Sequence, residues 1–194
     1  MTYDERNKEK MHNLFTASER DDIYRAKGKL QSMLNLYVGL YPPLSMNYIV
    51  AGGIFPSLLN DDNIHDVDVF VLSTTQDIVE AFMKNPSRFT QKGPVRNDEY
   101  HNGNQKSHII GVFNDKNNYI QYILTNYKTR QEVISNFDFV HSMVSYEKDN
   151  LYITRPMYDA IIKKRLIPNI PKDRINQKRF EKFKSRGYRE VDSI

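Results

Sequence analysis

Hydrophobic residues in the first third of the chain follow first a helical and then a strand-like spacing. After a polar arm, apolar side chains recur every three or four positions from residue 19 to residue 41, and Pro42 and Pro43 then stop this amphipathic helix. Two short apolar runs of strand length follow, and the second is rich in β-branched residues. The pattern predicts a helix over 19–41, a strand over 48–51, a short helix over 54–59 and a second strand over 67–72.

Later apolar runs come in pairs separated by short polar segments, as they do in hairpins. Residues 86–106 break this pattern, because the segment is rich in Pro, Gly and Asn and too long for a tight turn, which favours a functional loop. In chain order we expect helix 76–85, strands 107–113 and 119–125, helix 129–137, strands 139–146 and 151–154, and helix 157–166. This order predicts an α+β fold with a mixed β-sheet flanked by helices.

The composition is that of a globular protein with one domain. The chain has 194 residues, of which 39% are hydrophobic and 12% aromatic, enough for one sizeable core. We divide it into a polar N-terminal arm (1–18), a central domain (19–168) and a basic C-terminal tail (169–194). No apolar run approaches the roughly 18 residues that span a bilayer, so we expect no membrane partner.

The sequence contains no cysteine, which excludes disulfides and thiolate metal sites. The N-terminus carries charges with no apolar stretch behind them, so we expect no secretory signal. Both features fit a cytoplasmic protein, and for a phage-encoded one this would be the host cytoplasm.

The net charge of +4 is concentrated near the C-terminus, where Lys and Arg far outnumber Asp and Glu from Lys163 onward. Such a segment either contacts a polyanion such as nucleic acid or is a solvated surface. Phe180, Phe183 and Tyr188 lie among these charges, so the rings would either stack on the bases of single-stranded RNA or pack a short helix onto the domain. Of these two interpretations we favour packing.

Two aspartates in the second predicted strand carry the clearest chemical signal. Alternate residues of a strand share one face, so Asp66 and Asp68 project together while Val67 and Val69 face the core. Two neighbouring carboxylates repel one another unless a cation lies between them. Mg²⁺, or Mn²⁺ in its place, suits this position, because it takes oxygen ligands from a few carboxylates and the rest from phosphate and water.

The paired glycines Gly52 and Gly53 stand between the first predicted strand and the short helix. Without Cβ atoms they let a phosphate approach backbone N–H groups, and the start of a helix adds a partial positive charge. The glycines and aspartates together therefore predict phosphoryl or nucleotidyl transfer from a nucleoside triphosphate (NTP). Metal ions would neutralise the triphosphate and activate the attacking hydroxyl.

The segment from Gly52 to Asp68 resembles the first motif of the class II tRNA CCA-adding enzymes and bacterial poly(A) polymerases, which reads G-G-x-V-R-D-x-L-L followed by D-x-D. Residues 138–143 look like their second motif, R-R-D-F-T-I-N-A, whose Arg-Asp pair contacts nucleotide and ribose. The resemblance covers residues 46–166 and implies a polymerase-β-like nucleotidyltransferase fold. It also implies catalytic roles for Asp66, Asp68 and Asp138, metal binding by Asp66 and Asp68, and nucleotide binding by Gly52 and Gly53.

Several positions depart from these motifs. Pro56 and Ser57 replace the Arg-Asp of the first motif, Asn136 and Phe137 replace the two arginines of the second, and Ser142 replaces its asparagine. Little sequence follows residue 166, so we expect no tRNA-selecting neck, body and tail. The chain would then be a minimal catalytic head, of the kind seen in small phage-encoded and toxin–antitoxin nucleotidyltransferases.

The third catalytic carboxylate of the family would fall in residues 119–125, where Gln121 occupies the position. Gln holds a metal less well than a carboxylate. We keep Gln121 and Ser57 as candidates for nucleotide binding. Lys106, beside the long connection, would either meet the triphosphate or be a mobile surface charge.

Four further residues have two interpretations each. Asp138 is the remaining acid candidate, or a loop residue that bonds backbone amides. His65 would either grip phosphate or be a surface histidine. His108 and His141 lie in apolar segments, where a hydrogen-bonded core histidine is expected.

Two hypotheses follow. In the first, the protein is a Mg²⁺-dependent nucleotidyltransferase that moves a nucleotide from an NTP to an acceptor, either an RNA 3′ end or a protein hydroxyl. In the second, it kept the fold, lost the reaction, and is an RNA- or nucleotide-binding or structural module, as Gln121, Pro56 and Ser57 suggest. The sequence leaves the nucleotide, the acceptor and the oligomeric state open.

Overall fold

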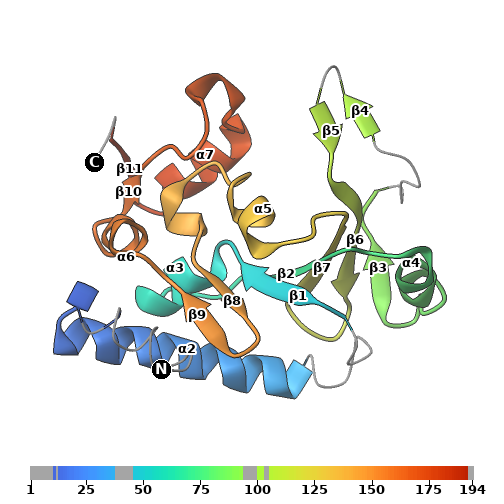
Figure 1. Ribbon diagram of the computed structural model, residues 1–194, viewed down its shortest axis with the longest axis horizontal. Helices are drawn as coiled ribbons and strands as arrows, with labels where there is room; N and C mark the ends of the chain where they lie inside the picture. The colour runs from blue at the N-terminus through green and yellow to red at the C-terminus, as the bar shows by residue number, and fades with distance from the viewer. Residues whose placement is uncertain (1–10, 12, 38–45, 94–99, 103–104, 192–194) are drawn as a thin grey trace.

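The centre of the protein is a seven-stranded mixed β-sheet (Figure 1). The computed structural model describes residues 11, 13–37, 46–93, 100–102 and 105–191, with the side chains of 100–102 and 105–107 excepted. The strands are ordered β3-β6-β7-β2-β1-β8-β9; β2 and β7 run parallel, and the other neighbours run antiparallel. They are β1 (Tyr48–Ala51), β2 (Val67–Val71), β3 (Phe89–Gln91), β6 (Ile109–Asp115), β7 (Ile120–Thr125), β8 (Ser145–Glu147) and β9 (Asn150–Tyr152).

Helices cover both faces of this sheet, which confirms the predicted α+β fold. The long helix α2 lies along one face, while α5 lies on the other (Figure 1). Within the described part of the chain, no helix combines the length and the apolar composition that crossing a bilayer requires. The helices are α2 (Ala17–Tyr37), α3 (Ile54–Leu59), α4 (Gln76–Met83), α5 (Arg130–Ile134), α6 (Arg155–Ile162) and α7 (Gln177–Ser185), with 3₁₀ turns η1 (Val140–Ser142) and η2 (Lys172–Arg174).

The alternation of side chains along β2 determines what lies on each face. Val67, Val69 and Val71 point into the main core, which they share with α2, α3 and α4. Phe70 points the other way and packs with residues of β7 and α5. Each buried side chain of this size stabilises the fold by about 1.5–3 kcal/mol. Asp68 alternates with the valines, so it lies on the same face of the sheet as Phe70.

The predicted strand over residues 139–146 is wrong in its first half. The chain forms the 3₁₀ turn η1 there, and β8 begins only at Ser145. The N–H of Gly52 donates to the carbonyl of Ser142 at 3.2 Å, so the chain turns to close the end of β1 instead of extending beside it. A single bridge between Phe139 and Pro168 is what remains of strand pairing at the start of this segment.

The long connection over residues 86–106 also contains more structure than predicted. β3 forms within it and pairs antiparallel with β6. A separate hairpin, β4 (Tyr100–Asn102) with β5 (Gln105–Ser107), lies between β3 and β6 in the chain and projects from the sheet (Figure 1). Since β3 is three residues long and buries only Phe89, it is too short to produce a visible period.

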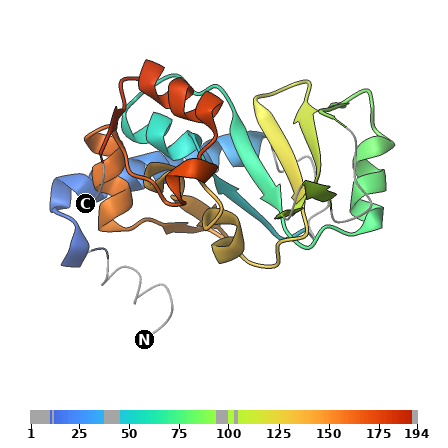
Figure 2. The same cartoon turned by 90° about the horizontal axis from the view of Figure 1, so that it is seen from above.

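The C-terminal segment folds back onto the domain. β10 (Arg165–Leu166) pairs in parallel with β11 (Arg189–Glu190), and α7 lies between them in the chain. Phe183 and Tyr188 are buried with Phe139 and Leu166, and Phe180 packs against them. The predicted packing of the tail aromatics is therefore confirmed. Figure 2 shows α4 (green) at one end of the molecule and α7 (red) well away from it.

Candidate active site

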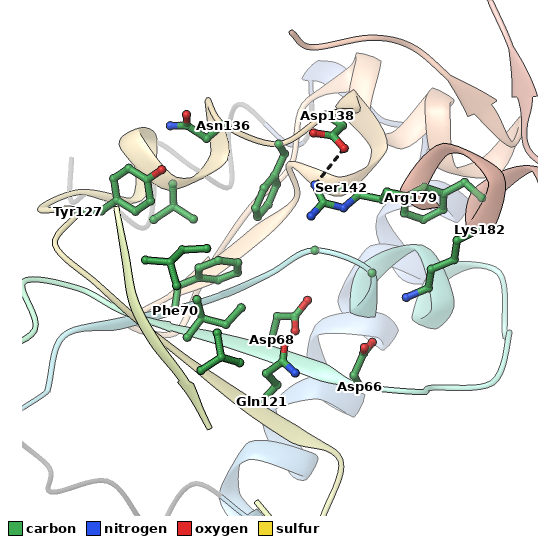
Figure 3. Close-up of a pocket in the computed structure, with 18 of the residues that line it drawn as sticks. Asp66, Asp68, Phe70, Gln121, Tyr127, Asn136, Asp138, Ser142, Arg179 and Lys182 are labelled. Atoms are coloured by element: carbon green, nitrogen blue, oxygen red, sulfur yellow. Dashed lines mark hydrogen bonds and ion pairs between the residues drawn. The ribbon is translucent and has the colours of Figure 1, made fainter. Parts of the chain in front are cut away.

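A cavity of about 320 Å³ opens on the α5 face of the sheet (Figure 3). Its centre is formed by the end of β1 and by β2, its apolar side by β6, β7 and α5, and its basic side by α7. It has the size of a small-molecule site. The central residues are Gly52, Gly53, Asp66, Asp68 and Gln121.

Asp66 and Asp68 both point into this cavity (Figure 3). Asp68 is in register with Ala51 on β1 and with Gln121 on β7, and Asp66 directly precedes β2. Burial and the neighbouring Asp66 carboxylate raise the pKa of Asp68 to about 7, while Lys182, Arg179 and Lys92 act in the opposite direction. In the described structure, Asp68 accepts no hydrogen bond and forms no ion pair, so its charge is uncompensated at short range.

Gly52 allows the Asp68 carboxylate to lie against the backbone. It has φ +90°, which favours glycine, and a Cβ at this position would lie 3.0 Å from Asp68 Oδ2. Gly53 differs, because its φ is −70° and a Cβ there would meet nothing within 4 Å. The space in front of Gly53 is therefore open, as the approach of a phosphate to the backbone requires.

Gln121 stands where the resemblance places a third carboxylate. Its Nε2 donates to Asn114 Oδ1 at 2.8 Å, which leaves its carbonyl oxygen and its second N–H for other partners. No group of three His, Cys, Asp or Glu residues suited to a metal ion occurs in the described ranges.

The residues of the cavity nevertheless fit one divalent cation. Asp66 and Asp68 offer carboxylate oxygens, and burial together with the neighbouring Asp66 carboxylate raises the pKa of Asp68. Mg²⁺ is commonly bound by one or two carboxylates, with substrate phosphate and water as the other ligands. A cation here would remove the repulsion between the two aspartates.

The basic side of the cavity was not predicted from the sequence. Arg179, Lys182 and Arg186 line it from α7 and its C-terminal end (Figure 3). Their spacing of three and four residues places them on one helical face, and this spacing was the available signal. The apolar side was not predicted either; it includes Phe70, Val112, Ile123, Tyr127, Val133 and Phe137.

The model of one protein family, described as Gabija anti-defense 2 family protein (Gad2), matches residues 5–164. This is most of the 194-residue chain. The chain belongs to this family. No curated protein matches the sequence of this Gabija anti-defense 2 family member.

Solved structures of CCA-adding enzymes share the fold of this family member. A CCA-adding enzyme in complex with CTP matches with a TM-score of 0.55 and 14% identity over 88% of this chain. An apo form gives a TM-score of 0.52 at 13% identity over 91%, and the Thermotoga maritima enzyme complexed with tRNA gives 0.51 at 15% over 88%. At such identities the likeness shows the nucleotidyltransferase-like fold alone. The chain spans 43%, 41% and 39% of these enzymes' lengths.

The remaining predicted residues of this family member lie in several places. Asp138 lines the cavity and is 6% exposed, and its Oδ2 accepts hydrogen bonds from Arg179 Nη1 at 3.0 Å and from the Asn176 N–H at 3.3 Å. It therefore anchors α7 and bonds a backbone amide. Ser57 is buried within α3 and does not line the cavity. Lys106 lies on β5, and its side chain is outside the described part of the structure.

The three histidines considered from the sequence, His65, His108 and His141, lie in different surroundings. His65 is exposed and does not line the cavity. His108 Nδ1 is 2.7 Å from Asn126 Oδ1, as expected of a hydrogen-bonded histidine. The same expectation is wrong for His141: it is fully buried, and neither ring nitrogen has a hydrogen-bond partner among the residues described. Burial lowers the pKa of His141 to about 3.

Proposed function

We propose that this protein is a Mg²⁺-dependent nucleotidyltransferase that moves a nucleotide from an NTP to an acceptor hydroxyl. The observation that carries the proposal is the pair Asp66 and Asp68, which point into one cavity beside the Gly52 turn. The nucleotidyltransferase-like fold shared with CCA-adding enzymes supports it. Mn²⁺ has the ligand preference to replace Mg²⁺.

In the proposed reaction the acceptor hydroxyl oxygen forms a bond to the α-phosphorus of the NTP. The bond from that phosphorus to the bridging oxygen breaks, pyrophosphate leaves, and the hydroxyl proton is released. A bound divalent cation supplies charge neutralisation of the phosphates and a lower pKa of the hydroxyl. Asp66 and Asp68 hold that cation, and Gly53 leaves room for a phosphate near the backbone.

The family description suggests the setting of this reaction. It places the family against a defence named Gabija, so we propose that the acceptor is an RNA 3′ end or a protein hydroxyl belonging to that defence. CTP and tRNA are bound by CCA-adding enzymes of the same fold, which supports an NTP as donor and leaves the acceptor to be identified.

A second candidate function is a binding module that has lost the reaction. The observation that favours it is Gln121, which faces Asp68 across the β2–β7 pairing where the resemblance places a carboxylate. Such a module would bind nucleotide or RNA through the same cavity without transferring anything.

Incubation with each labelled NTP, Mg²⁺ or Mn²⁺, and RNA and protein from cells carrying the Gabija defence tests the proposal. We expect label in one acceptor class with wild type and none with Asp66→Asn/Asp68→Asn. Asp77→Asn is the matched control, because Asp77 is exposed at the start of α4 and outside the cavity.

Gln121→Glu separates the two candidates. Label that appears only with this variant would favour the binding module, because restoring a carboxylate restores the reaction. No label with any protein would overturn the nucleotidyltransferase proposal.

A further inference from the structure

The cavity has a wall of positive charge that comes from a single helix. Arg179 and Lys182 lie on α7, and Arg186 lies directly after it. Of the residues that line the cavity, these three are its lysines and arginines. We propose that this face of α7 binds the polyphosphate of the donor nucleotide. The proposal rests on the proposed function only in taking a nucleotide as the source of the phosphate.

Lys182 is the residue with the clearest role. Its side chain is exposed and extends toward Asp66 in Figure 3. Its ammonium group has no hydrogen bond or ion pair within the part of the chain that is described. A lysine that lines a cavity beside two carboxylates, and is not paired with either, is free to neutralise an anion between them.

A polyphosphate in the cavity needs positive charge beyond that of a bound divalent cation. A divalent cation on Asp66 and Asp68 would balance those two carboxylates and leave no excess charge for a polyphosphate. Arg179 shares part of its guanidinium with Asp138, but an arginine has five N–H donors and this ion pair uses one of them. The two carboxylates and a divalent cation together have no positive charge in excess. The positive charge that binds a polyphosphate therefore comes from the α7 face.

The positions that correspond to the charged residues of the two motifs supply no positive charge. The first-motif arginine and aspartate are replaced by Pro56 and Ser57, both buried within α3. Asn136 and Phe137, which stand in place of the second-motif arginines, line the cavity without charge. Positive charge that the motifs would provide from the domain itself is thus provided here by the C-terminal segment.

Contacts at both ends of the cavity wall hold the helix itself in place. Asp138 binds both Arg179 and the N–H of Asn176, and the Asn176 side chain caps α7 by accepting from the N–H of Arg179. Phe183 is 5% exposed and packs the helix into the cluster formed with Phe139, Leu166 and Tyr188. A helix that is already in place does not have to be ordered when an anion binds, which lowers the entropy lost on binding.

Calorimetric titration with inorganic tripolyphosphate tests this wall, once with Mg²⁺ and once with EDTA. We expect Lys182→Ala to weaken binding by about tenfold, the effect of one charged hydrogen bond. The matched control is Lys178→Ala, which removes the same charge from an exposed position of α7 outside the cavity; its affinity should stay within about twofold of wild type. Circular dichroism checks that both variants fold.

Equal weakening by the two substitutions would overturn the proposal, because the effect would then come from overall charge. Absence of binding to wild type in both buffers would overturn it as well. In EDTA, the Asp66→Asn/Asp68→Asn variant should bind tripolyphosphate at least as tightly as wild type, because two repelling charges are removed.

These results are distinguishable from those of the transfer assay. Lys182-dependent binding of tripolyphosphate without any nucleotide transfer would support the anion-binding role of α7 and contradict the nucleotidyltransferase proposal. Nucleotide transfer by Lys182→Ala with unchanged KM and kcat would support the nucleotidyltransferase proposal and contradict the anion-binding role of α7.

Discussion

Gly52 brings the backbone at the end of β1 against the carboxylate of Asp68. We expect Gly52→Ala to destabilise the fold by about 1–2 kcal/mol, because alanine is strained at φ +90° and its Cβ would displace Asp68 Oδ2. Urea unfolding measures the change. Isothermal titration with Mn²⁺ should also show weaker binding, since the displaced carboxylate is a proposed ligand.

Gly53→Ala is the control for this prediction. Gly53 has φ −70° and open space where a Cβ would stand, so alanine fits there without backbone strain and should lower the free energy of unfolding by less than Gly52→Ala does. Similar losses in both variants would show that the close approach to Asp68 is not what requires glycine.

At this scale the sequence predicted the central residues and missed those at the sides of the cavity. Asp68 lies in β2 and Asp66 directly precedes it, two residues earlier, so their shared face follows from local geometry. Arg179 and Lys182 lie more than a hundred residues later and enter the cavity only because α7 folds back. No local spacing rule connects such distant positions.

At the scale of elements, the contact between η1 and α7 places an uncharged histidine in an aromatic cluster. The His141 ring lies 4.3 Å from the Phe183 ring and 4.6 Å from the Tyr188 ring, centroid to centroid. Burial lowers the pKa of His141 from 6.5 to about 3. Protonation of His141 is therefore unfavourable in the folded protein, whereas the same side chain in the unfolded chain takes up a proton below about pH 6.5.

Comparison of His141→Phe with wild type measures this effect. A depressed histidine pKa gives stability that is present above the unfolded pKa and is lost as pH falls toward the folded one. Between about pH 7 and pH 5, wild type should lose about 2 kcal/mol more than His141→Phe. Urea unfolding at each pH gives the difference, in which contributions common to both proteins cancel. Parallel pH profiles would contradict the prediction.

Elements were predicted well where a long periodic run exists and poorly where pairing depends on distant residues. The helix starting near residue 19 and the strands β1 and β2 follow from their own apolar pattern. β3 has one buried residue and forms because β6 lies beside it. η1 looks apolar enough for a strand, but its backbone turns to meet Gly52.

At the scale of the whole molecule, the charge on Asp68 couples folding to pH and, under the proposed function, to metal binding. The folded pKa of about 7 lies above the ordinary value of 3.8, so the folded state holds the proton more tightly. The resulting stability is present below about pH 4 and is lost as pH rises through about 7. In EDTA near pH 8, Asp68→Asn should therefore be more stable than wild type, by on the order of 1–2 kcal/mol.

Addition of Mg²⁺ should make wild type more stable than Asp68→Asn. A cation that binds only the folded state raises the unfolding midpoint, and the shift grows with its concentration. Thermal unfolding should show the shift for wild type and for Asp77→Asn but not for Asp68→Asn. An equal shift in all three proteins would mean that the cation binds elsewhere.

The overall architecture was the part of the molecule that the sequence predicted most fully. The order of apolar runs indicated a mixed sheet with helices, and the glycine and aspartate motif identified the nucleotidyltransferase-like fold. The side of the molecule on which the last segment packs could not be predicted, because it depends on the burial of Phe183 and Tyr188 against Phe139 and on the short β10–β11 pairing.

That packing has an evolutionary consequence. Asp68 is part of the central sheet, where a substitution disturbs the core, and Asp66 directly precedes its strand, whereas Arg179 and Lys182 reach the cavity from the surface of a peripheral helix. Mutations on this surface can alter the size or charge of the anion that fits while the sheet is left intact. Under the proposed role of this helix face, a lineage with this architecture could change the anion that it binds at little cost to folding.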